Sequence, residues 1–242
     1  MKNLQQPLKQ VCALLLALPL LIASSIAQGN DFPTAAPEDV GVSSERLQRL
    51  SNTMQRYIDS NMLAGTVSLV SRNGKVIHVE SQGWKNKESN EPMTDDSIFV
   101  IMSMTKPIVS TALMMLYEEG NFLLTDPITD WIPELEGKQV VIEEDGINYR
   151  MSAHRPITFR HVLSHTAGVD PSREVLTEEE LALLPRKATL EETIINRAPL
   201  PLSFHPGDDW QYGSSTDYVA LLVERISGQS LVDYLQEKIL DP

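Results

Sequence analysis

Two side chains with complementary chemistry lie one helical turn apart in the stretch Ser103-Met104-Thr105-Lys106. Residues three apart on a helix share a face, with Cβ atoms about 5–6 Å apart. A serine hydroxyl becomes a strong nucleophile only when a base takes its proton, and a lysine in a dry site can lose enough proton affinity to help. The spacing therefore makes Ser103 a candidate nucleophile and Lys106 a candidate base.

The same four residues are also compatible with a purely structural role. Serine is a common N-cap residue, and lysine can lay its aliphatic stem on an apolar surface while its ammonium group stays in water. A Ser-x-x-Lys sequence should occur by chance on the order of once in a chain of this length. Taken alone, the four residues favour the structural interpretation, so a catalytic one depends on the rest of the chain.

A second candidate base lies in the stretch Trp210-Gln211-Tyr212-Gly213-Ser214-Ser215. A tyrosinate beside a lysine cation has a lowered pKa and can accept a proton. The alternative is that the ring of Tyr212 is buried and anchors a loop between two helices. On this stretch alone, the anchoring role is the better interpretation.

The histidines suggest no metal or cofactor site. His161 and His165 are four residues apart on one predicted helix, but no glutamate lies between them and no third ligand is evident. We expect His165 to satisfy backbone groups at its helix end. The sequence also contains no Gly-x-Ser-x-Gly elbow and no phosphate-binding glycine loop. We therefore expect no metal and no cofactor.

The element that must position Ser103 is the apolar segment Pro107 to Glu119. Its apolar residues are spread over much of the helical circumference, which is typical of a buried helix. Pro107 suits a first turn, where a missing N–H does no harm. Ser103 is thus predicted at a helix N-terminus, where free N–H groups and the positive dipole end favour a developing oxyanion.

The remaining pattern predicts an α+β protein. We expect residues 28–120 to form an α/β part that carries the nucleophile helix, and residues 121–242 to form a mainly helical part. Two strands are predicted to form a hairpin at Asn73-Gly74. The expected elements are a helix over 44–61, strands over 65–71 and 75–81, a short helix over 126–135, a second hairpin around Asp145-Gly146, and short helices from Thr158 onward with capping boxes at Thr177/Glu180 and Thr189/Glu192.

Charge and the N-terminal segment limit the partners and the location. The formal net charge of -13 comes without a basic stripe, which argues against a nucleic-acid partner. Residues 1–27 are typical of a secretory signal peptide, with cleavage expected before Gln28; the alternative is a membrane anchor. After cleavage we expect no stable membrane insertion and a periplasmic or secreted protein. The single cysteine, Cys12, lies in this segment, so thiol catalysis is excluded from the mature chain.

Taken together, these stretches carry a family resemblance. The chain resembles the serine β-lactamase and penicillin-binding-protein superfamily, and within it the class C β-lactamase-related branch that includes family VIII carboxylesterases and D-amino-acid peptidases. The likeness covers nearly all of residues 38–242. The stretches that carry it are Ser103-Met104-Thr105-Lys106-Pro107, then Pro156 to Gly168 (PITFRHVLSHTAG), Phe204-His205-Pro206-Gly207 and Trp210-Gln211-Tyr212-Gly213-Ser214.

The resemblance implies a fold and a set of roles. An antiparallel sheet flanked by helices would pack on an all-helical domain. Ser103 would be the acyl-accepting nucleophile, and its backbone N–H would form half of the oxyanion hole. Lys106 and Tyr212 would share the proton transfers, and which of them is the base stays open. Ser214 matches the third position of the family's Tyr-x-Asn element, where it would bind and orient substrate or orient the lysine.

The sequence departs from the family pattern in two ways. Ser214 replaces the asparagine of class C β-lactamases, which argues against efficient β-lactam hydrolysis and favours the esterase-like branch. The third family motif, a Lys/His-x-Gly-type strand, would lie beyond Pro242. The chain is therefore interpreted as an N-terminal fragment that lacks the C-terminal strands of the sheet.

Three functions remain open from the sequence. The first is a serine hydrolase acting through an acyl-enzyme on an ester, amide or β-lactam carbonyl, most simply a carboxylesterase-type enzyme. The second is a penicillin-binding or D-amino-acid peptidase-like protein with a peptidoglycan-like substrate, which includes a module that binds without turnover. The third is an inactive fragment. The sequence does not predict an oligomeric state.

Overall fold

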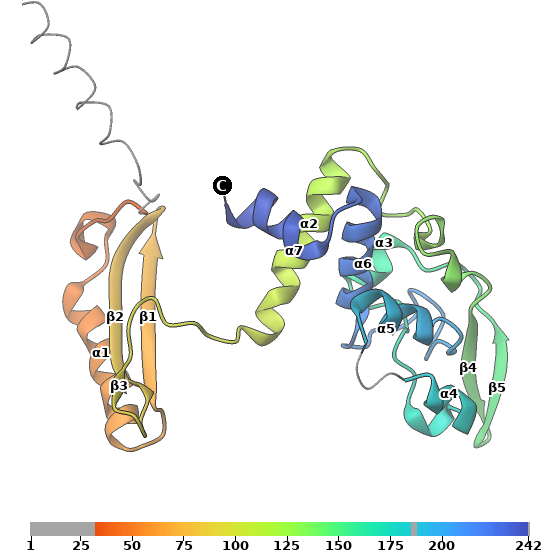
Figure 1. The fold of residues 1–242 in the computed structure, drawn as a ribbon, viewed down its shortest axis with the longest axis horizontal. Helices are drawn as coiled ribbons and strands as arrows, with labels where there is room; N and C mark the ends of the chain where they lie inside the picture. Colours follow the sequence, from red (N-terminus) through yellow and green to blue (C-terminus); the bar gives the residue numbers. More distant parts are fainter. Residues whose placement is uncertain (1–31, 185–187, 242) are drawn as a thin grey trace, which may run out of the picture. The chain divides into compact units, whose positions relative to one another are not determined.

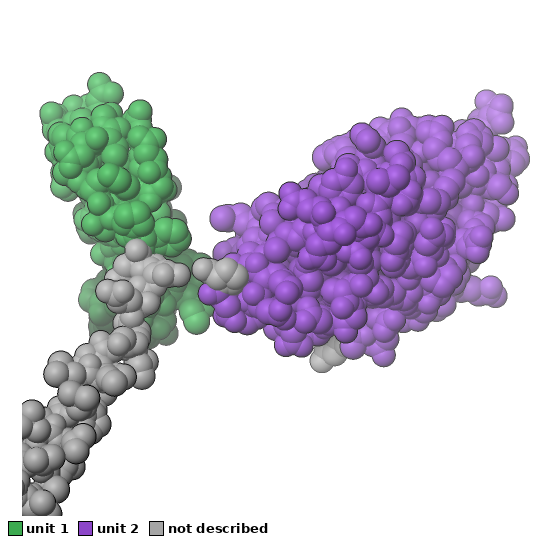
Figure 2. All heavy atoms as spheres, turned by 90° about the horizontal axis from the view of Figure 1, so that it is seen from above, with its two compact units in different colours: residues 1–99 green, residues 100–242 purple. Residues whose placement is uncertain are grey.

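The structure is a computed structural model that describes residues 32–184 and 188–241. It divides into two compact units, of which the first ends at Phe99 and the second begins at Val100 (Figures 1 and 2). The predicted signal sequence over residues 1–27 lies outside the described residues. Within the described part of the chain, no helix is long and apolar enough to cross a membrane.

The first unit pairs one helix with a small antiparallel sheet of order β1-β2-β3. Asn73 and Gly74 have φ values of 53° and 70°, as a two-residue type I′ hairpin turn requires. The predicted helix and hairpin are confirmed, although the second strand extends beyond Ser81. The elements are α1 (Ser44–Asp59), β1 (Gly65–Arg72), β2 (Lys75–Asn86) and β3 (Glu91–Pro92), preceded by the 3₁₀ turn η1 (Pro37–Val40).

The second unit consists of short helices and one hairpin. Its helices are α2 (Thr105–Glu118), α3 (Phe159–Leu163), α4 (Glu178–Ala182), α5 (Leu190–Arg197), α6 (Ser215–Ser227) and α7 (Leu231–Leu235). Its strands are β4 (Gln139–Glu144) and β5 (Ile147–Ser152). Shorter turns are η2 (Met102–Met104), η3 (Ile128–Asp130), η4 (Pro133–Leu135), η5 (Arg173–Val175) and the π-helical η6 (Gln236–Leu240).

The predicted capping boxes are both present. The Thr177 hydroxyl accepts from the Glu180 N–H at 3.2 Å, and the Glu180 carboxylate accepts from the Thr177 N–H at 2.9 Å. The same reciprocal pair joins Thr189 and Glu192. Each box satisfies two of the free N–H groups at a helix start, which explains why α4 and α5 begin where they do.

One predicted element has a different form. Instead of a single helix over 126–135, the chain makes the two 3₁₀ turns η3 and η4. Pro133 has no N–H to continue a helical hydrogen-bond ladder, and its ring disfavours helical geometry at the residue before it. Ile132 accordingly has φ -127° and ψ 71°, outside the helical region.

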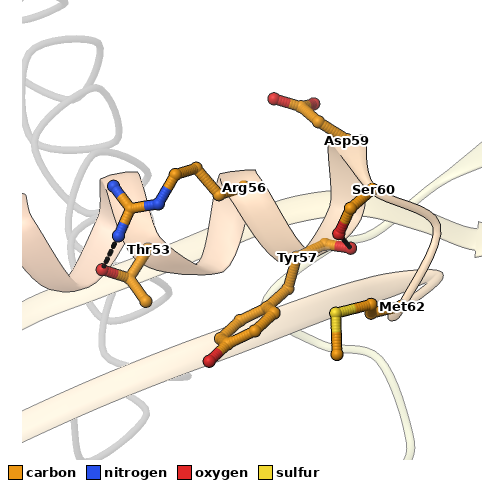
Figure 3. Close-up of a pocket in the computed structure, with 6 residues that line it drawn as sticks. All are labelled: Thr53, Arg56, Tyr57, Asp59, Ser60 and Met62. Carbon is orange, nitrogen blue, oxygen red and sulfur yellow. Dashed lines mark hydrogen bonds between the residues drawn. The ribbon is translucent and has the colours of Figure 1, made fainter.

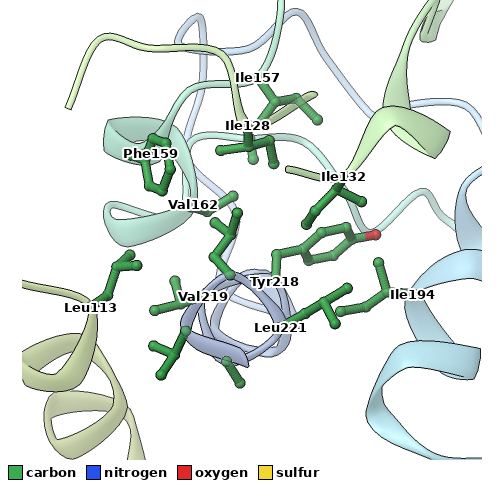
Figure 4. Close-up of a cluster of buried hydrophobic side chains, with 14 of the residues drawn as sticks. Leu113, Ile128, Ile132, Ile157, Phe159, Val162, Ile194, Tyr218, Val219 and Leu221 are labelled. Atoms are coloured by element: carbon green, nitrogen blue, oxygen red, sulfur yellow. The ribbon is translucent and has the colours of Figure 1, made fainter. Parts of the chain in front are cut away.

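Helix α6 forms the centre of the larger core (Figure 4). Its residues from Tyr218 to Val223 are all buried, and the helix packs against α2, α3, α5 and α7. Phe122 and Phe159 stack at 3.7 Å between ring centroids, with the edge of Trp131 against them. Burial of this kind stabilises by about 25 cal/mol per Å² of apolar surface. The packing of α2 on α6 determines where the starts of these two helices lie.

The division after Phe99 places α2 in the same compact unit as α6. The expected division after residue 120 placed it with the α/β part. The two divisions describe different things, because the expected one separated an α/β part from a mainly helical part within one domain over residues 28–242, expected to be incomplete at its C-terminus. That expectation stays a prediction.

Candidate active site

Ser103 and Lys106 lie at the start of the buried helix α2. Ser103 is in the 3₁₀ turn η2, and Lys106 is the second residue of α2. The Lys106 ammonium Nζ donates to Ser103 Oγ at 3.3 Å. The three-residue spacing thus places the two side chains in contact, as expected for residues on one helical face. Buried residues further along α2, such as Val109 and Leu113, hold the helix in the core.

The backbone immediately before Ser103 is unusual. Met102 has φ of +49°, a left-handed conformation that is uncommon for residues other than glycine. Such positions cost about 1–3 kcal/mol and tend to occur at functional sites. The 76% exposure of the Met102 side chain means that apolar burial does not offset that cost in the described structure. The strained residue thus lies in η2, the turn that contains Ser103.

Tyr212 reaches the same serine from a distant part of the sequence. Its hydroxyl donates to Ser103 Oγ at 2.7 Å, and Lys106 Nζ lies 4.9 Å from the centre of its ring. The hydrogen bond with Ser103, followed by the interaction with Lys106, lowers the pKa of Tyr212 below its usual value. The ring is 52% exposed, so it is not the buried loop anchor of the alternative interpretation.

The segment that carries Tyr212 leads directly into α6, which begins at Ser215. Because α2 and α6 pack together, their first turns bring Ser103 and Tyr212 into contact. Helix N-termini carry unpaired N–H groups and a partial positive charge. The start of α2 beside Ser103 therefore favours negative charge there, such as that of a developing oxyanion.

His165 contacts the segment that carries Tyr212. Its φ is +58°, its carbonyl accepts from Gln211 N–H at 2.9 Å, and its Nδ1 accepts from Gly213 N–H at 3.4 Å. The imidazole lies 4.9 Å from the Tyr212 ring. Burial, followed by the Lys106 cation, lowers the pKa of His165, which favours the neutral ring, whose Nδ1 can accept. The expected backbone contact is present, but the partner lies in the 211–213 segment.

Ser214 has its hydroxyl engaged away from Ser103. The Ser214 Oγ donates to Asp170 Oδ1 at 2.7 Å and accepts from Arg197 at 3.2 Å. Its backbone N–H donates to Asp170 Oδ2 at 2.7 Å. The substrate-binding role expected for Ser214 stays a prediction.

The structure therefore brings together Ser103, Lys106 and Tyr212, and joins Ser214 to Asp170 and Arg197 by hydrogen bonds. Sequence reasoning missed Asp170 and Arg197. Asp170 follows the His165-Thr166-Ala167-Gly168 stretch by two residues, and this was the one signal that could have drawn attention to it. Arg197 had none, because it ends a helix whose pattern indicates only an amphipathic surface element.

Within the described residues, neither a metal-binding cluster nor the hollow at the end of α1 provides a comparable site. Within residues 32–184 and 188–241, no group of three acidic, histidine or cysteine side chains is arranged to hold a metal. A depression at the end of α1 is lined by Thr53, Arg56, Tyr57, Asp59, Ser60 and Met62 (Figure 3). Its serine hydroxyl, on Ser60, donates to the Tyr57 carbonyl at 3.1 Å, and the six lining residues include no lysine or histidine to activate it.

An α+β chain with a Ser-x-x-Lys pair at one helix start, met by a tyrosine from the segment that leads into a second helix packed on the first, has the architecture of active-site-serine β-lactamase-like proteins. The sequence profile of the Beta-lactamase family matches residues 50–242, and the chain belongs to that family.

Named relatives in this family include esterases. Esterase EstB of Burkholderia gladioli is 30% identical over 201 residues, covering 80% of this chain and 49% of EstB. Lovastatin esterase of Penicillium rubens is 29% identical, covering 80% of this chain and 50% of that protein. Among solved structures, EstCE1, described as a hydrolase with promiscuous acyltransferase activity, superposes with a TM-score of 0.66 at 26% identity, over 81% of this chain and 51% of EstCE1. The chain spans about half the length of the relatives it matches.

Proposed function

We propose that this chain carries the nucleophile and proton-transfer residues of a serine hydrolase that works through an acyl-enzyme. The observation that supports the proposal most directly is that Lys106 Nζ and Tyr212 OH both contact Ser103 Oγ, at 3.3 and 2.7 Å. A hydroxyl between two groups that can exchange protons is the arrangement needed for an activated nucleophile. Membership of a family with esterase relatives agrees with it.

The reaction would proceed in two halves. Ser103 Oγ attacks the substrate carbonyl carbon and passes its proton to the base, either Tyr212 or Lys106. The bond to the leaving alcohol then breaks, and the alcohol oxygen takes that proton. In the second half, water attacks the Ser103 acyl ester, the same base accepts the water proton, and Ser103 Oγ recovers it as the acid product departs.

An ester is the substrate class that we propose. Alcohol leaving groups depart more easily than amines, and an exposed Ser103 site is compatible with a range of acyl groups. Position 214 offers a hydroxyl engaged by Asp170 and Arg197 in place of an amide side chain, which supports an ester over a β-lactam. A penicillin-binding or D-amino-acid peptidase activity on a peptidoglycan-like substrate is the second candidate, because a penicillin-binding protein 4* of Bacillus subtilis is 25% identical over 201 residues.

The test is intact-mass measurement after exposure to a fluorophosphonate, a p-nitrophenyl ester and a penicillin, followed by peptide mapping. It uses the 242-residue chain and, where the gene continues past Pro242, the full translated chain. We expect the fluorophosphonate at Ser103 and turnover of the ester, with slow or no turnover of the penicillin. A long-lived penicilloyl adduct without ester turnover would support the second candidate. No adduct on either folded chain would contradict a serine hydrolase.

We also propose a periplasmic or secreted location, supported by the signal-like pattern of residues 1–27. In a secreting host, the exported protein should start at Gln28 by N-terminal sequencing. A product that keeps residues 1–27 and sediments with membranes would instead indicate an anchor.

A further inference from the structure

The backbone around Tyr212 is irregular, so its position must come from neighbouring segments. Residues 210–213 have no helical or strand structure. On one side of Tyr212, the His165 carbonyl accepts from Gln211 N–H. On the other side, Asp170 accepts both the N–H and the hydroxyl of Ser214, each at 2.7 Å. The residues flanking Tyr212 are therefore each tied to the 165–170 segment.

The Gly213 backbone lies so close to Asp170 that a side chain at position 213 would force one of the two to shift. A Cβ built on Gly213 would lie 2.8 Å from the Asp170 carboxyl carbon, closer than real Cβ atoms approach. The Gly213 backbone thus lies directly against the carboxylate. Any larger residue there would displace the Asp170 carboxylate or the Tyr212 turn, and so disturb the contact between them.

Arg197, from the end of α5, supports Asp170. Its guanidinium lies 3.4 Å from Asp170 Oδ1 and donates to Ser214 Oγ at 3.2 Å. The Asp170 and Arg197 side chains are only 26% and 28% exposed. A half-buried carboxylate is stabilised by this paired cation and by the charge-assisted hydrogen bonds it accepts. The three side chains form one connected cluster, which we call the Asp170 clamp (Asp170, Arg197 and Ser214).

We propose that Asp170 is a positioning residue that holds Tyr212 OH against Ser103 Oγ, and that Ser214 serves this clamp. The inference rests on the proposed function, because it assigns a purpose to the clamp only if Tyr212 takes part in proton transfer. The clamp touches neither Ser103 nor Lys106 in the hydrogen bonds of the described structure. It acts through the two-residue connection from Ser214 back to Tyr212. A displacement of about 1 Å at a reacting group can cost on the order of 100-fold in rate.

The test compares Asp170→Ala with Asp170→Asn and a matched control, Glu180→Ala. Glu180 is also a half-buried carboxylate that accepts a backbone N–H, from Thr177 at 2.9 Å, and pairs with an arginine, Arg150, at 3.0 Å. Glu180→Ala therefore measures how much kcat changes when a similar carboxylate is removed elsewhere in the same compact unit. Circular dichroism and thermal midpoints identify the variants that remain folded.

The readout is turnover of an ester for which acylation of Ser103 is the slow step, as shown by the absence of a burst of released alcohol, separated into kcat and KM. We expect Asp170→Ala to lower kcat about 10- to 100-fold with little change in KM, and Asp170→Asn to recover part of that loss, since its side-chain oxygen can still accept from Ser214 N–H. Glu180→Ala should leave kcat within about twofold, because it lies outside the clamp. An Asp170→Ala protein with unchanged kcat would overturn the inference.

A double variant distinguishes positioning of Tyr212 from a general loss of order. Once the Tyr212 hydroxyl is gone, its position no longer matters, so Asp170→Ala/Tyr212→Phe should be no slower than Tyr212→Phe alone. Fully additive losses would overturn the proposal. If wild-type protein is not acylated at Ser103 at all, the proposed function fails; if it is acylated and the losses are additive, only the clamp fails.

Ser214→Ala keeps the test decisive if Asp170→Ala does not fold. It removes one hydroxyl and leaves the backbone bond to Asp170. If Ser214 belongs to the clamp, Ser214→Ala should have a few-fold lower kcat and an unchanged KM. The double variant Ser214→Ala/Tyr212→Phe should then be no slower than Tyr212→Phe alone. A raised KM with unchanged kcat would show that Ser214 binds substrate and would overturn its place in the clamp.

Discussion

Replacing Ser103 with alanine is expected to abolish covalent labelling by a fluorophosphonate and to lower ester turnover by on the order of 10⁴-fold or more, as loss of a nucleophile does in other serine hydrolases. The reason is direct: the side-chain oxygen contacted by both Lys106 and Tyr212 is gone. Turnover is measured by release of p-nitrophenol, and labelling by intact mass.

Ser103→Ala should fold like the wild type. Ser103 is exposed and lies outside the buried core, and substitutions at such positions usually change stability by about 0.5 kcal/mol or less. Ser110→Ala, two turns further along the same helix, is the matched control and should keep both labelling and turnover. Wild-type turnover by folded Ser103→Ala protein, or equal losses in both variants, would reject Ser103 as the nucleophile.

The elements that the sequence predicted well are those encoded by short-range signals. The Asn73-Gly74 turn has the positive φ values that its residue types favour, and the Thr177 capping box depends on residues three apart. The contact between Ser103 and Lys106 is of the same kind, because one helical turn fixes it. In each case, the interacting groups lie within a few residues of one another.

The contact between Tyr212 and Ser103 could not be predicted from short-range signals. Ser103 and Tyr212 are 109 residues apart, and only the packing of α6 on α2 joins them. The family resemblance pointed to Tyr212, whereas residue periodicity alone favoured a loop anchor.

The Asp170 clamp was missed because three segments contribute to it. These are the stretch after α3, the end of α5 and the start of α6. No spacing rule relates positions 170, 197 and 214. Their side-chain types, an acid, a base and a hydroxyl, are common on protein surfaces. Only the folded arrangement shows that they form one cluster, joined to the chain two residues after Tyr212.

Replacing Tyr212 with phenylalanine is expected to slow Ser103 acylation by about 10²- to 10⁴-fold, the usual contribution of a general acid–base group. The substitution keeps the ring, its place 4.9 Å from Lys106 Nζ and its contact with His165, and removes only the hydroxyl. Tyr149→Phe, at an exposed position on β5, is the matched control and should acylate normally.

The pH dependence of acylation tests whether Tyr212 is the base. A tyrosine acts as a base only when it is ionised, so the wild-type rate should rise with pH and level off above the pKa of Tyr212. Because the contacts with Ser103 and Lys106 lower that pKa, the midpoint of the rise should lie below pH ~10, the usual tyrosine value. The Tyr212→Phe protein should acylate more slowly than the wild type, and its acylation rate should no longer rise with pH in this way.

The alternative base, Lys106, predicts a different result for the same variant. If Lys106 takes the Ser103 proton, Tyr212→Phe loses a hydrogen bond but retains the rising pH profile at a lower rate. Lys106→Met would then remove the rise, whereas with Tyr212 as base it would shift the rise to higher pH, because the cation that helps to lower the tyrosine pKa is gone. The pH profiles of Tyr212→Phe and Lys106→Met are measured with the spontaneous hydrolysis of the ester subtracted. Together they assign the proton transfer to either Tyr212 or Lys106, the two groups that contact Ser103.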